Sequence, residues 1–390
     1  MRILFFISGF ELGGAERQAI MLAEYMRSEG HEVFFWGLGK PGKVSMLCDE
    51  KKIAWNSIKI NRNPFRVLFD IRKISPDVII PFCTYPSLLC AISWRFTDVK
   101  VCLWNERDIG LSRDLQTMFP SAFKLSSCVV TNSEGGKNYI KKEFGSELDV
   151  RVINNGITLP LPKKTKEVWR KELDIKESTF VACIVANLTK VKNHSLLIHG
   201  WNDALKLSVV PKDSLLVLAG REDQMAESLR TQVANYGIQD KVKFLGQVDD
   251  VSGLLNVVDI GILSSFSEGQ PNAILEYMYV GLSIIASDIP GNKEILQDTE
   301  SCFFKTDSAK DLVEAFRVMR SFDRRYESGK KNASLCRQKY SPEKMFADYK
   351  ALLDELISKK RKRVSFKTWF NIGLSVLTFI ITSRKRKSKQ

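Results

Sequence analysis

The chain of 390 residues alternates short apolar segments with segments of helical period, and this alternation restricts the possible folds more than any other feature. Most of the apolar segments are continuous, which is typical of strands in a parallel sheet that is covered on both faces. The segments between them are long enough for crossover helices. The predicted strands are residues 2–8, 31–37, 76–82, 100–105, 128–132 and 150–154, followed by 180–186, 215–220, 241–246, 260–265, 283–287 and 302–305.

This order of elements predicts two consecutive doubly wound α/β domains with about six strands each. We place them at residues 1–160 and 161–340, because two prolines and a basic run interrupt the pattern between them. Residues 341–358 are predicted to form a helix that packs back on the body, and 359–390 form a basic tail. Ligands of open α/β sheets bind at the carboxyl ends of the strands. We therefore expect the two domains to face a cleft and to share one site.

The positive charge of the chain is concentrated in the tail. The net charge is +14, but residues 358–390 hold eleven Lys/Arg and no acidic residue, which leaves +3 for residues 1–357. A nucleic-acid-binding body should carry its own basic face, so we expect no nucleic-acid partner.

Cysteine use indicates a reducing compartment. The eight cysteines form no Cys-x-x-Cys pair, and several lie in apolar runs. They are predicted to be buried thiols in a cytoplasmic protein, with neither disulfides nor a metal site. The histidines His194 and His199 are predicted to serve packing.

Two glutamates, Glu268 and Glu276, flank the predicted start of a helix in the second half of the chain. Pro271 suits the first helical position, and Gly281 is the predicted end of the helix. Helical side chains lean toward the N-terminus, so both carboxylates can border one pocket. Carboxylates accept hydrogen bonds from the diol of a ribose or hexose, whereas free amides at a helix start favour a phosphate. The residues expected to form this helix start, called the amide corner below, are Gly269, Gln270, Pro271, Asn272 and Ala273.

The stretch 266–291, FSEGQPNAILEYMYVGLSIIASDIPG, resembles the E-x7-E signature of retaining glycosyltransferases with the GT-B fold, in particular glycosyltransferase family 4. The resemblance covers nearly the whole chain. ELGGAERQ at 11–18 is similar to the first glycine-rich loop of the family, and VINNGIT at 152–158 is similar to the segment that enters the second domain. VANLTKVKNH at 185–194 is similar to the phosphate loop.

The resemblance implies roles for individual residues. Glu276 would hold the ribose of the nucleotide, and Glu268 would contact the donor hexose near the reacting carbon. Lys192 would neutralise the diphosphate leaving group. Gly13 and Gly14 would let the backbone approach the donor.

The chain departs from the family at Asn187, where many members carry an arginine. The family arrangement then lacks one cation next to the diphosphate. Arg221 or Lys190 could replace it.

The acceptor side also departs from the family. Many relatives have a histidine where this chain has WNERDIG at 104–110. The acceptor proton would then pass to Glu106, to Asp108 or to the donor phosphate. Arg107 stays protonated and cannot act as a base, but it could bind a phosphate or a hydroxyl.

The chain has no Asp-x-Asp motif, which metal-dependent transferases use to hold Mg²⁺ or Mn²⁺. The leaving-group charge would be met by helix amides and Lys192 instead. We therefore expect no metal and no cofactor besides the sugar-nucleotide substrate.

The tail contains a 14-residue apolar stretch, 369–382, between two basic clusters. A spanning helix needs roughly 20 apolar residues, and the polar positions of this stretch fall on one narrow helical face. This pattern predicts a basic amphipathic helix that lies on an anionic membrane surface, although a short spanning anchor and a disordered tail are alternatives. The predicted contacts with the membrane interface are Trp369, Phe370, Leu374, Leu377 and Ile381.

Together these features predict a retaining glycosyltransferase on the cytoplasmic face of the cell membrane. It would move a hexose-type sugar from a nucleotide-diphosphate sugar to a glycan or lipid-linked oligosaccharide during surface polysaccharide assembly. A sugar-nucleotide epimerase of the same fold and a non-catalytic membrane-bound scaffold are the alternatives.

Overall fold

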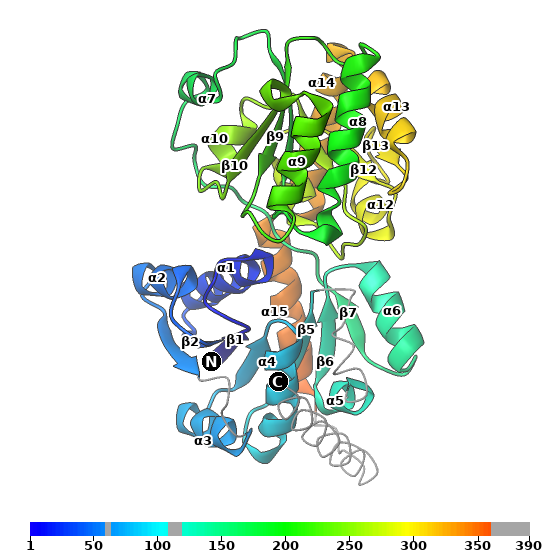
Figure 1. Cartoon of the computed structure of the whole chain (residues 1–390). Helices are drawn as coiled ribbons and strands as arrows, with labels where there is room; N and C mark the ends of the chain where they lie inside the picture. Colours follow the sequence, from blue (N-terminus) through cyan, green and yellow to red (C-terminus); the bar gives the residue numbers. More distant parts are fainter. Residues whose placement is uncertain (59–63, 108–118, 360–390) are drawn as a thin grey trace, which may run out of the picture. The chain divides into compact units, whose positions relative to one another are not determined.

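The computed structural model describes residues 1–58, 64–107 and 119–359 (Figure 1). The chain divides into two compact units. The first combines Met1–Asn155 with the segment that starts at Glu343, and the second is Gly156–Pro342. The sequence predicts a boundary after residue 160, so the first unit ends slightly earlier than predicted. Each unit is built on one parallel sheet, which confirms the predicted pair of doubly wound α/β domains.

The sheet of the first unit has seven strands in the order β3-β2-β1-β4-β5-β6-β7, all parallel. The order reverses between β1 and β4, which makes the carboxyl end of this strand pair the switch point where ligands of such sheets bind. The strands are β1 (Arg2–Ile7), β2 (Glu32–Leu38), β3 (Ala54–Ile58), β4 (Val78–Pro81), β5 (Val101–Glu106), β6 (Cys128–Thr131) and β7 (Val150–Val152).

The edge strand β3 is the only strand of the described residues that the sequence pattern does not predict. Its segment, AWNSI, contains no continuous apolar run, and its residues alternate between exposed and partly buried positions before Ile58. An edge strand needs burial on one face only, so a search for continuous apolar runs overlooks it.

The sheet of the second unit repeats the same design with six parallel strands in the order β10-β9-β8-β11-β12-β13. All six were predicted from the sequence. The switch point lies between β8 and β11. The strands are β8 (Phe180–Val185), β9 (Ser214–Ala219), β10 (Val242–Gly246), β11 (Ile260–Leu263), β12 (Ser283–Ser287) and β13 (Cys302–Phe304).

Helices connect the strands in both units. Those of the first unit are α1 (Gly14–Ser28), α2 (Lys43–Glu50), α3 (Pro64–Ile74), α4 (Thr84–Ser93), α5 (Phe119–Leu125), α6 (Glu134–Phe144) and α15 (Pro342–Ser358). Those of the second are α7 (Lys166–Leu173), α8 (His194–Lys206), α9 (Ala226–Tyr236), α10 (Val251–Leu255), α11 (Asn272–Tyr279), α12 (Pro290–Leu296), α13 (Ala309–Val318) and α14 (Phe322–Lys339).

Both faces of each sheet are buried, which explains the continuous apolar runs. In β1, the side chains of Ile3, Phe5 and Ile7 lie in one hydrophobic cluster, whereas Leu4 and Phe6 lie in another. Two clusters likewise cover the faces of the second sheet. A strand between two apolar layers has no polar face, so its sequence does not alternate.

Helix α15 completes the core of the first unit, although it follows the second unit in the chain (Figure 1). Its apolar side chains lie in the same cluster as Ile3 and Phe5, and Phe346 stacks on Tyr25 with 4.1 Å between ring centroids. The buried side chains of α15 are Met345, Tyr349, Leu352, Leu353 and Leu356.

The structure describes the chain as far as residue 359, so the predicted tail contacts from Trp369 to Ile381 lie outside the described residues. Among residues 1–58, 64–107 and 119–359, no helix is both long and apolar enough to cross a membrane.

Candidate active site

The loop after β11 leads into α11 and carries the first of the two predicted glutamates. Pro271 is the N-cap of α11 with an extended ψ of 117°, so the helix begins one residue later than predicted. Proline suits this place because it lacks an N–H group and its φ is fixed at a compatible value. Gly281, at φ +76°, follows the end of the helix as predicted.

Glu268 contacts the lysine that the sequence assigns to the diphosphate. Its Oε1 accepts a hydrogen bond from the Ser265 hydroxyl at 2.5 Å and forms an ion pair with Lys192 Nζ. The two side chains are 13% and 27% exposed, respectively, so both groups remain within reach of a ligand. The loops that follow β8 and β11 thus bring a cation and a carboxylate together at the switch point of the sheet.

A set of short contacts fixes the backbone around this ion pair. The Ser264 hydroxyl donates to the carbonyl of Lys192 at 2.7 Å, and the Ser287 hydroxyl donates to the carbonyl of Ser265 at 2.6 Å. A Cβ atom at Gly291 would lie less than 3 Å from the carbonyl oxygens of Glu268 and Gly269. Only glycine at the start of α12 therefore permits the loop to pass so closely.

The second glutamate, Glu276, is buried in the second turn of α11. Burial and then the negative charge of Glu276 raise the pKa of the Cys183 thiol in β8. The neighbouring Tyr277 anchors the helix to the sheet: its hydroxyl accepts from the Val185 N–H at 2.7 Å and donates to the Ile262 carbonyl at 3.2 Å. The two predicted carboxylates thus come from one loop-and-helix unit.

The predicted amide corner also lies here. Gly269, Gln270 and Pro271 precede the helix, and Asn272 and Ala273 are its first two residues. The first turn of a helix leaves N–H groups without intrahelical partners and favours negative charge. This end of α11 can therefore accept an anionic group next to the Lys192–Glu268 pair.

Asn187 and Arg221 lie together beyond the carboxyl ends of β8 and β9. Asn187 Oδ1 accepts from the Arg221 backbone N–H at 3.1 Å, so the asparagine fastens one loop to the other. The Arg221 side chain is 59% exposed, and its guanidinium lies 3.6 Å from the Asp223 carboxylate. The backbone of Arg221 is thus held by Asn187, whereas its side chain extends toward solvent.

In the first unit, the predicted glycines lie where the chain enters α1. Gly13 is the N-cap of α1 in extended conformation, and Gly14 is its first residue. They follow β1, which is one of the two strands at the switch point of this sheet. Their lack of side chains leaves the backbone of this helix start accessible.

Glu106 is the last residue of β5 and is only 4% exposed. Its Oε2 accepts hydrogen bonds from the Thr84 hydroxyl and from Trp104 Nε1, both at 3.3 Å. Thr84 begins α4, so the carboxylate lies between the ends of two strands that are adjacent in the sheet. Asp108, the alternative proton acceptor, lies outside the described residues.

Arg107 is 7% exposed, and its guanidinium contacts protein groups. It donates to Asn155 Oδ1 at 2.7 Å and to the Tyr349 hydroxyl, and it stacks over the Phe82 ring at 4.9 Å. These contacts hold Arg107 against neighbouring residues of the first unit, and its predicted binding of a phosphate or a hydroxyl stays a prediction.

The structure adds partners that sequence reasoning missed. Ser265 lies three residues before Glu268, and a hydroxyl at that spacing is a usable signal for a bond to the carboxylate. Thr84 and Tyr349 carry no such signal, because they approach β5 from distant parts of the chain.

Comparison with known families identifies the class of enzyme. Residues 12–160 match the family model described as Glycosyltransferase Family 4, and residues 165–334 match the model described as Glycosyl transferases group 1. The two models meet close to the division between the units and together cover most of the chain. The chain is a glycosyltransferase.

Known relatives of this glycosyltransferase span nearly its full length. It is 23% identical to an uncharacterized glycosyltransferase of Haemophilus influenzae, over 90% of this chain and 99% of the relative. It is 25% identical to the N,N'-diacetylbacillosaminyl-diphospho-undecaprenol alpha-1,3-N-acetylgalactosaminyltransferase of Campylobacter jejuni, over 79% of this chain and 86% of the relative.

Solved structures show the same fold. Anabaena Alr3699/HepE, crystallised in complex with UDP and glucose, superimposes on the glycosyltransferase with a TM-score of 0.80. The match covers 91% of this chain and all of the Anabaena chain at 19% identity. The two parallel-sheet domains are those of the GT-B fold, as predicted.

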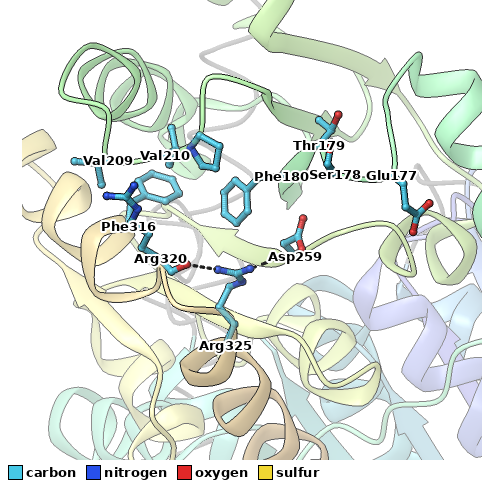
Figure 2. A pocket seen from close by; sticks show the side chains of 11 residues that line it. Glu177, Ser178, Thr179, Phe180, Val209, Val210, Asp259, Phe316, Arg320 and Arg325 are labelled. Carbon is cyan, nitrogen blue, oxygen red and sulfur yellow. Dashed lines mark hydrogen bonds and ion pairs between the residues drawn. The ribbon is translucent and has the colours of Figure 1, made fainter.

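The second unit of the glycosyltransferase also has a recess at the other end of its strands, beside the amino ends of β8, β9 and β11 (Figure 2). Its central guanidinium, that of Arg325, is engaged by the protein. It donates to the carbonyls of Met319 and Arg320 at 3.0 and 2.7 Å and lies 4.0 Å from Asp259. This recess contains none of the predicted site residues, and its arginine ties α14 to the end of α13.

Proposed function

We propose that this glycosyltransferase transfers a hexose-type sugar from a UDP-sugar to a lipid-linked saccharide with retention of anomeric configuration. The observation that carries the proposal is the contact between Lys192 and Glu268 at the mouth of α11. A cation for the diphosphate and a carboxylate for the sugar hydroxyls meet there, with Glu276 in the next turns of the same helix.

The relatives support the donor and acceptor classes. HepE was crystallised with UDP and glucose, and the name of the Campylobacter relative specifies an acceptor sugar on diphospho-undecaprenol. An acceptor of that kind is held in a membrane. The basic tail predicted to bind anionic lipids would keep the enzyme at the cytoplasmic surface where such an acceptor is found.

The proposed reaction needs one bond to form and one to break. The acceptor oxygen bonds to the anomeric carbon, and the bond from that carbon to the UDP oxygen breaks with its electrons on the phosphate. The acceptor proton passes to Glu106, to Asp108 or to the departing phosphate. Lys192 and the α11 amides stabilise the charge that develops on the diphosphate, a task that other transferases give to a metal ion.

The test is transfer by the purified full-length protein. Radiolabelled UDP-glucose, UDP-galactose, UDP-GlcNAc and UDP-GalNAc are each incubated with undecaprenyl-diphosphate-linked N-acetylhexosamine, and the lipid product is separated and counted. We expect transfer from one donor, and NMR of the product should show the anomeric configuration of that donor. No transfer from any donor by the folded protein would contradict the proposal. An altered UDP-sugar formed without acceptor would indicate an epimerase instead.

A further inference from the structure

A buried network of hydrogen bonds lies at the carboxyl end of β5 and reaches helix α15. The Tyr349 hydroxyl donates to Asn105 Oδ1 at 2.7 Å and accepts from Arg107. Asn105 Nδ2 donates to the Pro81 carbonyl at 2.8 Å, and Arg107 Nη1 donates to Asn155 Oδ1 at 2.7 Å. Through Asn105 and Arg107, the Tyr349 hydroxyl on α15 thus connects the carboxyl ends of β4 and β5 with Asn155.

The network straddles Glu106. Successive side chains of a strand point to opposite faces, so Asn105 and Arg107 share one face and Glu106 points to the other. The contacts agree with this geometry, because Glu106 bonds to Thr84 and Trp104, whereas its two neighbours bond to Tyr349. Tyr349 therefore holds the residues on both sides of the carboxylate.

The chemistry of the network favours a fixed geometry. Burial raises the pKa of the Tyr349 phenol, although the Arg107 guanidinium lowers it, so the hydroxyl stays protonated and can donate. Arg107 supplies two donors from a planar group, and these reach Tyr349 on α15 and Asn155 in the loop after β7.

Stability alone gives a poor account of this arrangement. The partners of the buried Arg107 charge within the described residues are an amide, a phenol and the Phe82 ring, none of them negatively charged, and its Nε makes no hydrogen bond there. A buried charge with neutral partners is less favourable than an apolar side chain of similar volume.

We propose that Tyr349 and Arg107 are positioning residues for transfer, because together they fix the direction in which Glu106 meets the acceptor hydroxyl. The inference rests on the proposed function, since it assigns Glu106 to the acceptor side. It makes α15 a part of the acceptor site, although no side chain of this helix touches the reacting atoms.

The decisive variant is Tyr349→Phe, which removes one oxygen and keeps the buried ring. Transfer to undecaprenyl-diphosphate-linked N-acetylhexosamine should fall about tenfold in kcat, as expected when one buried hydrogen bond is lost. The KM for the UDP-sugar and the slow hydrolysis of the UDP-sugar in water should stay within twofold of wild type. A fall confined to transfer separates positioning at the acceptor side from general damage to the fold.

Tyr25→Phe is the matched control. Tyr25 also packs against α15, through its stacking on Phe346, but within the described residues no hydrogen bond joins its hydroxyl to β5. This variant should transfer and hydrolyse as the wild type does.

Arg107→Lys is a second test of the positioning role, which can be used if Tyr349→Phe unfolds. A lysine keeps the charge, but its single ammonium group cannot reach Asn155 and Tyr349 in the same geometry. It should show the same selective loss of transfer, with UDP still bound in a thermal-shift assay.

The outcomes distinguish this inference from the function on which it rests. If wild-type protein transfers sugar and both variants keep its ratio of transfer to hydrolysis, the positioning role is wrong and the proposed function stands. If wild-type protein hydrolyses UDP-sugars but transfers to no acceptor, the proposed function is wrong, and the role of Glu106 is wrong with it.

Discussion

At the scale of single residues, the Lys192–Glu268 pair is the contact on which the proposed chemistry depends. Glu268→Gln keeps the shape of the side chain and removes its charge, so the ion pair with Lys192 is lost. We expect transfer to fall at least about 100-fold, as for other groups that meet charge at the reacting centre. UDP binding, measured by calorimetry, should persist because Lys192 and Glu276 remain.

A control for this variant comes from the same unit. Glu300 forms an exposed ion pair with Lys331, away from the loops that follow β8 and β11. Glu300→Gln should leave transfer unchanged. Normal turnover in Glu268→Gln would remove this residue from the active site.

His194 predicts a pH dependence of stability. Burial and then the charge of Lys192 lower the pKa of His194 to about 4, below its ordinary value of 6.5. In the window between these values the unfolded chain binds a proton that the folded chain does not bind. Stability from this group is therefore present above pH 6.5 and is lost as the pH falls toward 4.

The His194→Gln variant isolates this effect. Between pH 7 and pH 5, the free energy of unfolding of the wild type should fall by about 2 kcal/mol more than that of the variant. Urea unfolding at several pH values measures the difference. Parallel pH profiles for the two proteins would contradict the assignment.

At the scale of secondary-structure elements, the start of α12 packs closely against the backbone of the loop that carries Glu268. In Gly291→Ala, the new Cβ would meet the backbone carbonyls of Glu268 and Gly269, which cannot move as a flexible side chain can. We expect the loop to shift and transfer to fall more than tenfold, since a displacement near 1 Å has effects of that size. The melting temperature should fall as well, because Gly291 is buried and backbone atoms have to shift to admit the methyl group; a fully active variant would show that the close approach is unimportant.

The tail makes a prediction for membrane attachment. Full-length protein should float with liposomes that contain anionic lipids, whereas a variant ending at residue 358 should stay in the soluble fraction. The truncation removes the two basic clusters and the apolar stretch between them, and it keeps α15 complete. Equal flotation of both proteins would rule out the tail as the anchor.

The predictability of each element follows from where its stabilising contacts lie. Strands β1, β8, β9, β11 and β12 can be predicted because burial on both faces requires continuous apolar runs. The edge strand β3 cannot, because its exposed residues Ala54 and Asn56 alternate with partly buried ones. The switch-point loops could be predicted from local patterns, since Glu268, Pro271 and Gly281 lie close together in the chain. The Tyr349–Arg107 bond joins residues 242 positions apart, and no local pattern encodes such a contact.

At the scale of the whole molecule, both sheets reverse their strand order at one switch point, and Gly13 and Gly14 follow β1 while Lys192 and Glu268 follow β8 and β11. The negative charge that develops on the departing UDP should be stabilised by protein groups alone. Dialysis against EDTA, followed by assay in EDTA, should therefore leave transfer unchanged within twofold, as should added Mg²⁺. A loss of activity that Mg²⁺ or Mn²⁺ restores would show that the diphosphate needs a metal.

The place of α15 in the first unit has a consequence for biosynthesis. When the ribosome has made Met1–Asn155, the apolar surface that Tyr349 and Leu353 will cover is still open to water. About 200 further residues must follow before that helix emerges, which takes on the order of 10–40 s at usual elongation rates. The nascent first domain therefore waits with an incomplete core while the second is translated, and it depends during that time on chaperones or on a provisional collapse of its own side chains.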